Sequence, residues 1–233
     1  MSIPSRDAPL PEGEEKARAV RAMFDAIAPR YDLVNRVMTF RMDVGWRRRT
    51  VDELGLPSGS IVLDLASGTG DLSRELRGRD LEAISVDLSE GMLRADRSGV
   101  PRVLADVLRL PLRDGDADGA TCGFALRNLR ELPAFFAELA RVVRVGGRVA
   151  LLEVATPDNP VMRWGHGIYF GHVVPVIGGW LSDGDAYRYL PRSVAYLPDP
   201  QVLVEMFRAA GFPDAARTAL SGGIAQLLTG TRR

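Results

Sequence analysis

Along residues 14–54 the apolar positions recur at steps of three and four, which is the spacing of an amphipathic helix. The clearest run of this pattern is Val20, Met23, Phe24 and Ile27. Pro29 interrupts the pattern because proline lacks the N–H that a helix needs, and Gly55 with Pro57 ends it. The segment therefore predicts a group of N-terminal helices.

From residue 61 onward, short apolar runs alternate with helical segments. The candidate strands are IVLDL, LEAISVDLS, VPRVLADV, GATCGFAL and GGRVALLEV, and the helices between them are DLSRELRGR, EGMLRADRS and ELPAFFAELARVV. This alternation indicates βαβ units and a parallel sheet with helices on both faces. After the helix DPQVLVEMFRAAGF, the runs DAARTAL and GIAQLLTGT predict a terminal pair of strands. The expected fold class is α/β, a doubly wound, Rossmann-like, mostly parallel seven-stranded sheet.

Two segments fall outside this alternation. Residues 1–13 combine proline with charge and are expected to form a disordered tail. Residues 156–198 are rich in glycine, proline and aromatic residues and predict a helical insertion, or substrate lid, ahead of the last strands. Residues 14–233 are expected to form a single domain.

Composition narrows the classes of partner. The chain has 233 residues, and 30 Lys and Arg balance 30 Asp and Glu, which argues against a nucleic-acid partner bound through its phosphates. Cys122 is the one cysteine, and no Cys/His cluster has the spacing of zinc ligands, so no metal is expected. The N-terminus has no apolar run of signal-peptide length, and Arg163, His166 and His172 interrupt the most apolar stretch. We therefore expect a cytoplasmic protein.

The sequence IVLDLASGTGDL places a glycine loop directly after the first predicted strand. In a doubly wound sheet, ligands bind outside the carboxyl ends of the strands. A dinucleotide site would need the fingerprint G-x-G-x-x-G, but Gly68 and Gly70 are not followed by its third glycine. Asp71 also puts a negative charge where a pyrophosphate would lie. Both features disfavour a nicotinamide-dependent oxidoreductase.

S-adenosylmethionine fits the acidic residues near this loop better, because it carries a sulfonium and an ammonium and no phosphate. Asp64 or Asp71 can face the ammonium, Asp87 after the second strand can accept both ribose hydroxyls, and Asp106 after the third can accept the adenine amino group. The alternative is that these aspartates are helix N-caps, a position that Asp favours. Acids at successive strand ends predict S-adenosylmethionine as the cofactor.

Several longer motifs carry a resemblance to a known family. In order along the chain they are MFDAIAPRYDLVNRVMTF, DLASGTGDL, VDLSEGML, ADVLRLPLRDGDAD, GFALRNL, ARVVRVGGRVALLEV and YRYLPRSV. GTGD alone indicates only a methyltransferase, whereas RYDLVN, LRN and YRYL are far more particular. From about Met23 to the C-terminus the chain resembles the C-methyltransferases of ubiquinone and menaquinone biosynthesis.

The resemblance implies transfer of a methyl group to a ring carbon of a prenylated quinol, demethylmenaquinol or a related compound. It places cofactor contacts at Thr69, Asp87, Asp106 and Val107. Gly123 stands where the family often has a serine, so one side-chain hydroxyl is missing. The full set of expected cofactor-binding residues is Tyr31, Asp64, Gly68, Thr69, Gly70, Asp87, Asp106, Val107 and Gly123.

The implied chemistry needs a quinolate, since carbon is a poor nucleophile until a neighbouring hydroxyl loses its proton. We expect Arg127 to stabilise the quinolate and Asn128 to orient the water or hydroxyl that removes the proton. His172 is a candidate base because histidine titrates near neutral pH. The alternatives are an Arg127 that forms a salt bridge at a helix start and a His172 at the surface.

Three questions stay open at the level of sequence. The apolar stretch 161–181 can line a channel for the prenyl tail, rest on the inner face of a membrane, or form a second helical core layer. A homodimer is neither indicated nor excluded. The competing functions are a methyltransferase of another small molecule or lipid, which the glycine at position 123 keeps open, and a cofactor-binding protein without turnover, which the LRN triplet disfavours.

Overall fold

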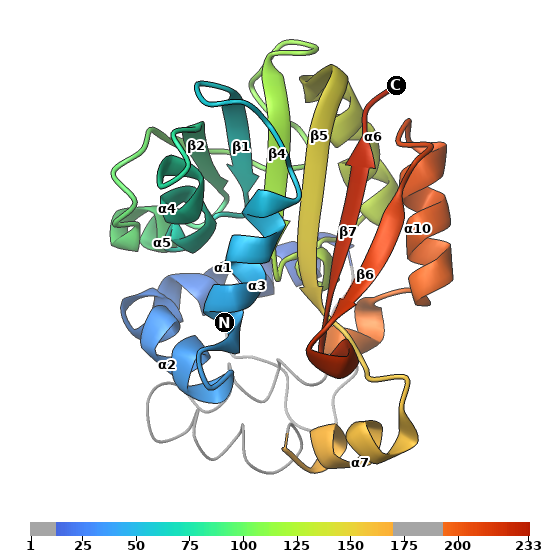
Figure 1. Cartoon of the computed structure of the whole chain (residues 1–233). Helices are drawn as coiled ribbons and strands as arrows, with labels where there is room; N and C mark the ends of the chain where they lie inside the picture. The colour runs from blue at the N-terminus through green and yellow to red at the C-terminus, as the bar shows by residue number, and fades with distance from the viewer. Residues whose placement is uncertain (1–12, 170–192) are drawn as a thin grey trace.

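The structure, a computed structural model, describes residues 13–169 and 193–233. Its centre is a seven-stranded sheet in the order β3-β2-β1-β4-β5-β7-β6 (Figure 1). Neighbouring strands from β3 to β5 pair in parallel, and β7 runs antiparallel to both of its neighbours. The strands are β1 (Ile61–Leu65), β2 (Glu82–Asp87), β3 (Arg102–Leu104), β4 (Ala117–Gly123), β5 (Val143–Val154), β6 (Ala216–Leu220) and β7 (Ala225–Thr231). The expected doubly wound, mostly parallel seven-stranded sheet is confirmed.

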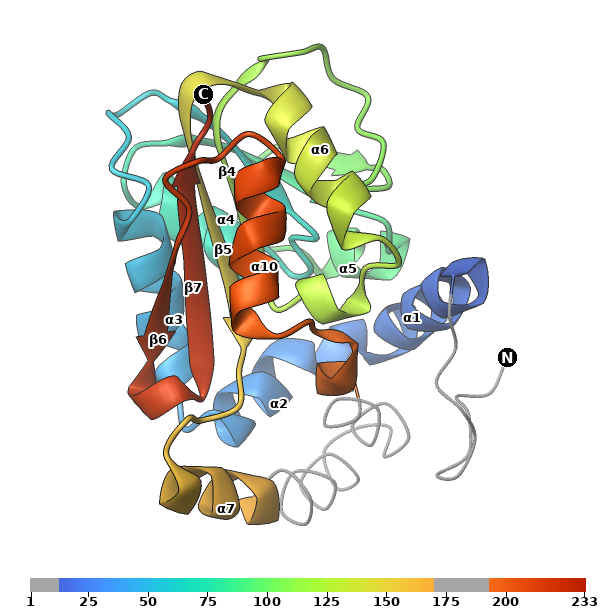
Figure 2. The same cartoon turned by 90° about the vertical axis from the view of Figure 1, so that its right-hand side faces the viewer.

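Helices cover both faces of the sheet, with α6 and α10 on one face and α3 and α4 on the other (Figure 2). The α-helices are α1 (Gly13–Ile27), α2 (Tyr31–Met38), α3 (Met42–Asp52), α4 (Asp71–Arg77), α5 (Glu90–Ala95), α6 (Leu132–Val142), α7 (Pro160–Ile168) and α10 (Pro200–Ala209). Short 3-10 turns are η1 (Ala28–Arg30), η2 (Leu126–Asn128), η4 (Val194–Tyr196) and η5 (Ser221–Gly223). Within the described residues, no helix combines the length and the apolar character needed to cross a bilayer.

The strands supply two separate cores because successive side chains point to opposite faces of a sheet. On β5, Val149 and Leu151 pack in the core under α6 and α10, whereas Ala150 and Leu152 pack in the core under α3 and α4. The sheet is therefore buried on both faces, as continuous apolar strand sequences require.

Two strands are shorter than their apolar runs predict. β3 spans three residues only, and β4 ends at Gly123 rather than continuing through Phe-Ala-Leu. The chain leaves the sheet at Phe124 because this residue has a left-handed φ of 59°, which no strand can accommodate. Of the predicted insertion, α7 and η4 are described; residues 170–192 and the first 12 residues lie outside the described part of the chain.

The strand order reverses between β1 and β4, which leaves a crevice at the carboxyl ends of these strands. We call residues 13–52, which hold α1, α2 and α3, the N-terminal cap. In Figures 1 and 2 the helices α1 and α2 lie across this end of the sheet. The position of the cap decides what the crevice can hold.

An ion-pair network docks the N-terminal cap on the first crossover. Asp71, the first residue of α4, meets Arg36 of α2 at 3.1 Å and Arg47 of α3 at 3.3 Å. Arg74 contacts the same carboxylate, and Asp43 of α3 pairs with Arg47. Asp43 and Arg47 are buried, so solvent and salt screen the ion pairs that Arg47 forms with Asp43 and Asp71 only weakly.

Two more acids of the N-terminal cap hold the neighbouring loops. Asp32 of α2 accepts a hydrogen bond from the Thr69 hydroxyl in the glycine loop. Asp25 of α1 accepts from the Ser89 hydroxyl at 2.5 Å and from the Gly91 N–H at 2.9 Å. The cap is thus fixed to the loops that follow both β1 and β2.

Replacing Asp71 with Asn should lower the free energy of unfolding by about 2–4 kcal/mol, because three guanidinium groups lose their shared anion. The matched control is Asp52→Asn, which removes an ion pair between Arg79 and a carboxylate that is 57% exposed. That control should cost less than about 0.5 kcal/mol. Urea denaturation of both variants tests this, and equal losses would contradict the docking role of Asp71.

Candidate functional site

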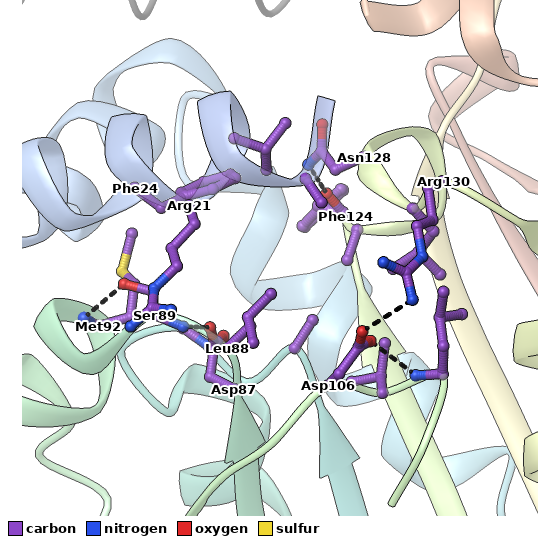
Figure 3. A pocket seen from close by; sticks show the side chains of 18 of the residues that line it. Arg21, Phe24, Asp87, Leu88, Ser89, Met92, Asp106, Phe124, Asn128 and Arg130 are labelled. Carbon is purple, nitrogen blue, oxygen red and sulfur yellow. Dashed lines mark hydrogen bonds and ion pairs between the residues drawn. The ribbon is translucent and has the colours of Figure 1, made fainter. Parts of the chain in front are cut away.

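A first cavity of about 120 Å³ lies at the carboxyl ends of β1, β2 and β4, under α1. Figure 3 shows Asp87 and Asp106 at the strand ends on one side of it, and Arg21 and Phe24 of α1 on the opposite side. The cavity lies where the switch in strand order predicts a ligand site.

The glycine loop forms one wall of the first cavity. Gly68 lines the cavity with a φ of 57°, and a Cβ there would lie 3.9 Å from the Met92 sulfur and 4.0 Å from the Tyr31 ring. Gly70 has a φ of 80°, and a Cβ there would overlap the Asp96 carboxylate. The left-handed φ favours glycine at both positions; at Gly70 a Cβ would also clash, whereas at Gly68 it would take up space in the cavity. Thr69 is buried and does not line this cavity.

Asp87 connects the loop to the cavity. One carboxylate oxygen accepts from the Gly68 N–H and the other from the Ser89 N–H, both at 2.8 Å. Burial raises the pKa of the Asp87 carboxyl, and these backbone donors oppose that shift. A carboxylate oxygen has two lone pairs, so each oxygen can accept another hydrogen bond from a ligand in the cavity.

Asp106 stands at another part of the same wall. Its carboxylate accepts from the Leu108 N–H at 2.9 Å and lies 3.3 Å from the Arg130 guanidinium. Val107 and Gly123, two of the residues predicted to bind the cofactor, line this cavity too, and so does Asn128. The sequence analysis did not single out Arg130, although it follows the LRN triplet by two residues.

Two predicted acids lie outside the wall of the first cavity. Asp71 is occupied by the ion pairs of the N-terminal cap. Asp64 is fully buried on the α4 side of β1, where it accepts from Ser73 at 2.6 Å and from Thr121 at 3.1 Å. This differs from the expectation that one of them faces a ligand ammonium. The reason is strand alternation, which turns the fourth residue of β1 toward the core under α4.

Asp64 belongs to a buried chain of oxygen atoms. Ser73 contacts Asp64 at 2.6 Å and Ser85 at 2.8 Å, and Ser85 contacts Asp96 at 2.8 Å. Three oxygen–oxygen contacts need three protons, but the two hydroxyls carry only two. The third proton must sit on a carboxyl, and burial raises the pKa of Asp64 to about 6. Below about pH 6, Asp64 therefore holds a proton in a structural chain next to the glycine loop.

A second cavity of about 340 Å³ lies between the N-terminal cap, η2 and α7. Most of its wall is apolar, and the cap side includes Met38, Phe40 and Trp46. Met162 of α7 and Ile224 line the other side. A cavity of this size with a mostly apolar wall fits an apolar ring that carries an apolar side chain.

Arg127 brings a positive charge to the wall of the second cavity. Its side chain is 5% exposed and is held by Ser193 at 3.1 Å, by the Phe124 carbonyl at 2.8 Å and by an ion pair with Glu153. Glu153 is fully buried on β5 and also accepts the Arg127 backbone N–H at 3.1 Å. Nη2 of Arg127 has no hydrogen-bond or ion-pair partner among residues 13–169 and 193–233.

Glu153 was missed by the sequence analysis, although a signal for it exists. It is the one acid in the apolar run VALLEV, just as Asp64 is the one acid in IVLDL. An acid within a buried strand needs a partner, because an isolated charge is costly to bury. For Glu153 that partner is Arg127.

Three further predicted site residues lie in the walls of the two cavities. Asn128 lines the first cavity, Arg127 lines the second, and Tyr31 lines both. Burial raises the pKa of the Tyr31 hydroxyl, so it remains protonated at neutral pH. His172, the candidate base, lies outside the described residues.

Three comparisons with known proteins show what this chain is similar to. Residues 12–232 match the model of the ubiE/COQ5 methyltransferase family. A demethylmenaquinone methyltransferase of Roseiflexus castenholzii is 41% identical, and the match covers 96% of this chain and 98% of that one. The ubiquinone/menaquinone biosynthesis C-methyltransferase UbiE of Geobacter sp. strain M21 is 37% identical over 94% of this chain and 98% of that one.

Among solved structures, a SAM-dependent methyltransferase of Thermotoga maritima, described as a possible histamine N-methyltransferase, has a TM-score of 0.66. It shares 18% sequence identity, and the match covers 91% of this chain and 99% of that one. At this identity the likeness concerns the fold alone.

The pKa of Asp64 predicts how stability depends on pH. Between about pH 4 and pH 6 the unfolded chain has released this proton and the folded protein still holds it, so unfolding becomes easier as pH rises. The shift from 3.8 to about 6 corresponds to on the order of 3 kcal/mol lost across this window. Asn cannot titrate, so Asp64→Asn does not lose this stability. The free energy of unfolding of Asp64→Asn minus that of the wild type should therefore rise from pH 4 to 6 and then level off. Urea midpoints at pH 4–8 measure it; a difference independent of pH would refute the shared proton.

Proposed function

The chain belongs to the ubiE/COQ5 methyltransferase family, and on that premise we propose that it transfers a methyl group from S-adenosylmethionine to a ring carbon of a prenylated quinol. Demethylmenaquinol or a related compound is the proposed acceptor. The observation that carries this proposal is the meeting of two unlike cavities at Tyr31 and Phe124. One has carboxylates at strand ends, and the other is apolar with a buried guanidinium.

The first cavity suits the cofactor. Asp87 accepts hydrogen bonds from the ribose hydroxyls, using the lone pairs that its backbone donors leave available. Asp106 accepts a hydrogen bond from the adenine amino group. Gly68 leaves space where any side chain would enter the cavity between Met92 and Tyr31. Val107 and Gly123 complete the apolar part of this wall.

The second cavity suits the quinol ring and the start of its tail. A ring hydroxyl that loses its proton leaves an oxyanion, which Arg127 stabilises because its guanidinium is permanently charged and lies in apolar surroundings. Glu153 acts as a positioning residue, because it holds Arg127 in place through the side chain and the backbone N–H. Asn128 lines the first cavity and not the second, so it belongs to the cofactor side of this arrangement.

When bound, the cofactor supplies a methyl group on a positively charged sulfur, so that a carbon–carbon bond forms as the carbon–sulfur bond breaks, sulfur keeps the bonding pair and the ring proton leaves to water. The task of the chain is to hold the two reactants in line and to exclude other nucleophiles. Positioning of this kind can supply about 7–11 kcal/mol of the barrier at best.

A transfer assay with a reduced prenylated demethylnaphthoquinol tests the function. Arg127→Ala should lower kcat by about 10²–10³-fold while the Kd for S-adenosylmethionine stays unchanged, because the lost interaction forms with the oxyanion.

Gly68→Val should instead weaken cofactor binding, measured by calorimetry, and NADH should not bind. Arg144→Ala is the control for both variants. It removes an arginine at the opposite end of β5 and should leave kcat and cofactor binding unchanged. Turnover of another acceptor but not of the quinol would favour the alternative, a methyltransferase of another small molecule or lipid.

We also propose that the surface around the second cavity rests on a membrane. Phe40 is 70% exposed and Trp164 is 71% exposed, and Phe40 and Met162 border the cavity. The helices α2 and α7 lie at the same end of the molecule (Figures 1 and 2). Exposed aromatic side chains at the mouth of an apolar cavity would let a prenyl tail enter directly from lipid.

Sedimentation with vesicles of phosphatidylethanolamine and phosphatidylglycerol tests this surface. The double variant Phe40→Ser, Trp164→Ser should bind at least about tenfold more weakly than the wild type, because each buried apolar side chain contributes about 1.5–3 kcal/mol. Val145→Ser is the matched control, since Val145 is 71% exposed and lies at the far end of the sheet. A wild type that stays in the supernatant would rule out membrane binding.

A further inference from the structure

Among the described residues, only Tyr31 and Phe124 line both cavities. Tyr31 comes from the start of α2, and Phe124 follows β4 directly. Whatever passes between the cavities therefore passes these two side chains. Tyr31 lies on a helix of the N-terminal cap, whereas Phe124 is the first residue after a central strand of the sheet.

The backbone of Phe124 is held in an unfavourable conformation. Its φ of 59° is rare for a bulky residue. The N–H donates to the Leu152 carbonyl at 2.7 Å, and the carbonyl accepts from Arg127 at 2.8 Å and from Asn128 at 3.5 Å. Strain of this kind persists where the surroundings determine it from several sides, and it gathers at functional sites. The left-handed turn ends the strand and directs the ring toward the crevice.

The ring of Phe124 is also held from the side of the second cavity. The Trp46 ring lies 6.2 Å away at an angle of 60°, and the Arg47 guanidinium lies 5.4 Å from the ring centroid. Trp46 is fixed by a hydrogen bond to Ser221 at 2.8 Å, and Arg47 by its ion pairs in the N-terminal cap. An edge-to-face pair and a cation–π contact together leave the ring one position.

A methyl group moves only when the donor sulfur, the methyl carbon and the acceptor carbon are in line. The methyl carbon and the acceptor carbon must also lie within about 3–3.5 Å of each other. The acceptor ring must therefore stop at the junction of the cavities. We propose that Phe124 is the residue that stops it: its fixed ring stacks on a flat acceptor, sets the depth of that ring and thereby selects planar acceptors. This inference rests on the proposed function, because it specifies how the same site places its substrate.

Three phenylalanines provide a matched experiment. Phe24 lines the first cavity alone, Phe40 lines the second alone, and Phe124 lines both. Each is changed to Leu, and kcat, the two KM values and the Kd for S-adenosylmethionine are measured. Phe24→Leu should raise the KM for the cofactor, and Phe40→Leu should raise the KM for the quinol. Phe124→Leu should lower kcat by up to about 100-fold, with the cofactor Kd changed less than about threefold, because the acceptor is misplaced.

Acceptor shape provides the second readout. Naphthoquinol is compared with tetrahydronaphthalenediol, which keeps the reacting ring but has a saturated, puckered second ring. The wild type should prefer the planar compound by about tenfold or more in kcat/KM, and Phe124→Leu should reduce the preference to less than about threefold. Phe124→Gly serves as the check on folding, since glycine accepts the φ of this position without strain. It should melt no lower than Phe124→Leu and show the same loss of selectivity.

The outcomes separate the two proposals. A wild type that binds S-adenosylmethionine but methylates neither compound nor a prenylated quinol would overturn the proposed function. A wild type that methylates them, with Phe124→Leu and Phe124→Gly unchanged in kcat and in planar preference, would overturn the role of Phe124 alone. A cofactor Kd that weakens in proportion to the loss of kcat/KM would also overturn it, because Phe124 would then serve cofactor binding.

Discussion

The carboxylate of Asp71 is the contact on which the arrangement of the whole site depends. It meets the guanidinium groups of Arg36, Arg47 and Arg74, and so ties α2 and α3 to the first residue of α4. The first cavity takes walls from α1 and α2, and the second takes walls from α2 and α3. Without the docked N-terminal cap, the crevice in the sheet would be exposed to solvent, and a ligand bound there would be in contact with water. An ion-pair network is suited to this task because it fixes direction as well as distance.

The two cavities divide the chemistry between them. The sheet supplies carboxylates at its strand ends, where backbone N–H groups hold Asp87 in one orientation. The second cavity is mostly apolar, and a guanidinium there acts on a nearby negative charge more strongly than it would in water. Burying that guanidinium is tolerable only because Glu153 is buried with it. Phe124 lines both cavities and its carbonyl accepts a hydrogen bond from Arg127, so the junction of the cavities and the buried guanidinium belong to a single turn of chain.

For Asp64 and Glu153, the strand sequence predicts that the carboxyl is buried but not which residues contact it. Each is the single acid in an otherwise apolar strand, and for each the sequence indicates a buried carboxyl that needs partners. Asp64 meets hydroxyl groups and shares a proton with them, whereas Glu153 meets a guanidinium and forms an ion pair. The difference depends on which residues of distant segments reach the same face. Ser73 and Arg127 have no sequence spacing that connects them to their partners.

The alternation of apolar runs determined the sheet, its helices and the position of the glycine loop, because burial on both faces leaves a parallel strand little other choice. The acids at strand ends likewise indicated that Asp87 and Asp106 lie at one site, since parallel strands share one carboxyl edge. Only the tertiary structure decided that Asp71 serves the N-terminal cap, that Asp64 lies below the loop and that Phe124 turns out of its strand. Those three outcomes depend on contacts between segments far apart in the chain, and the free energy of such contacts is set by packing that no local pattern contains.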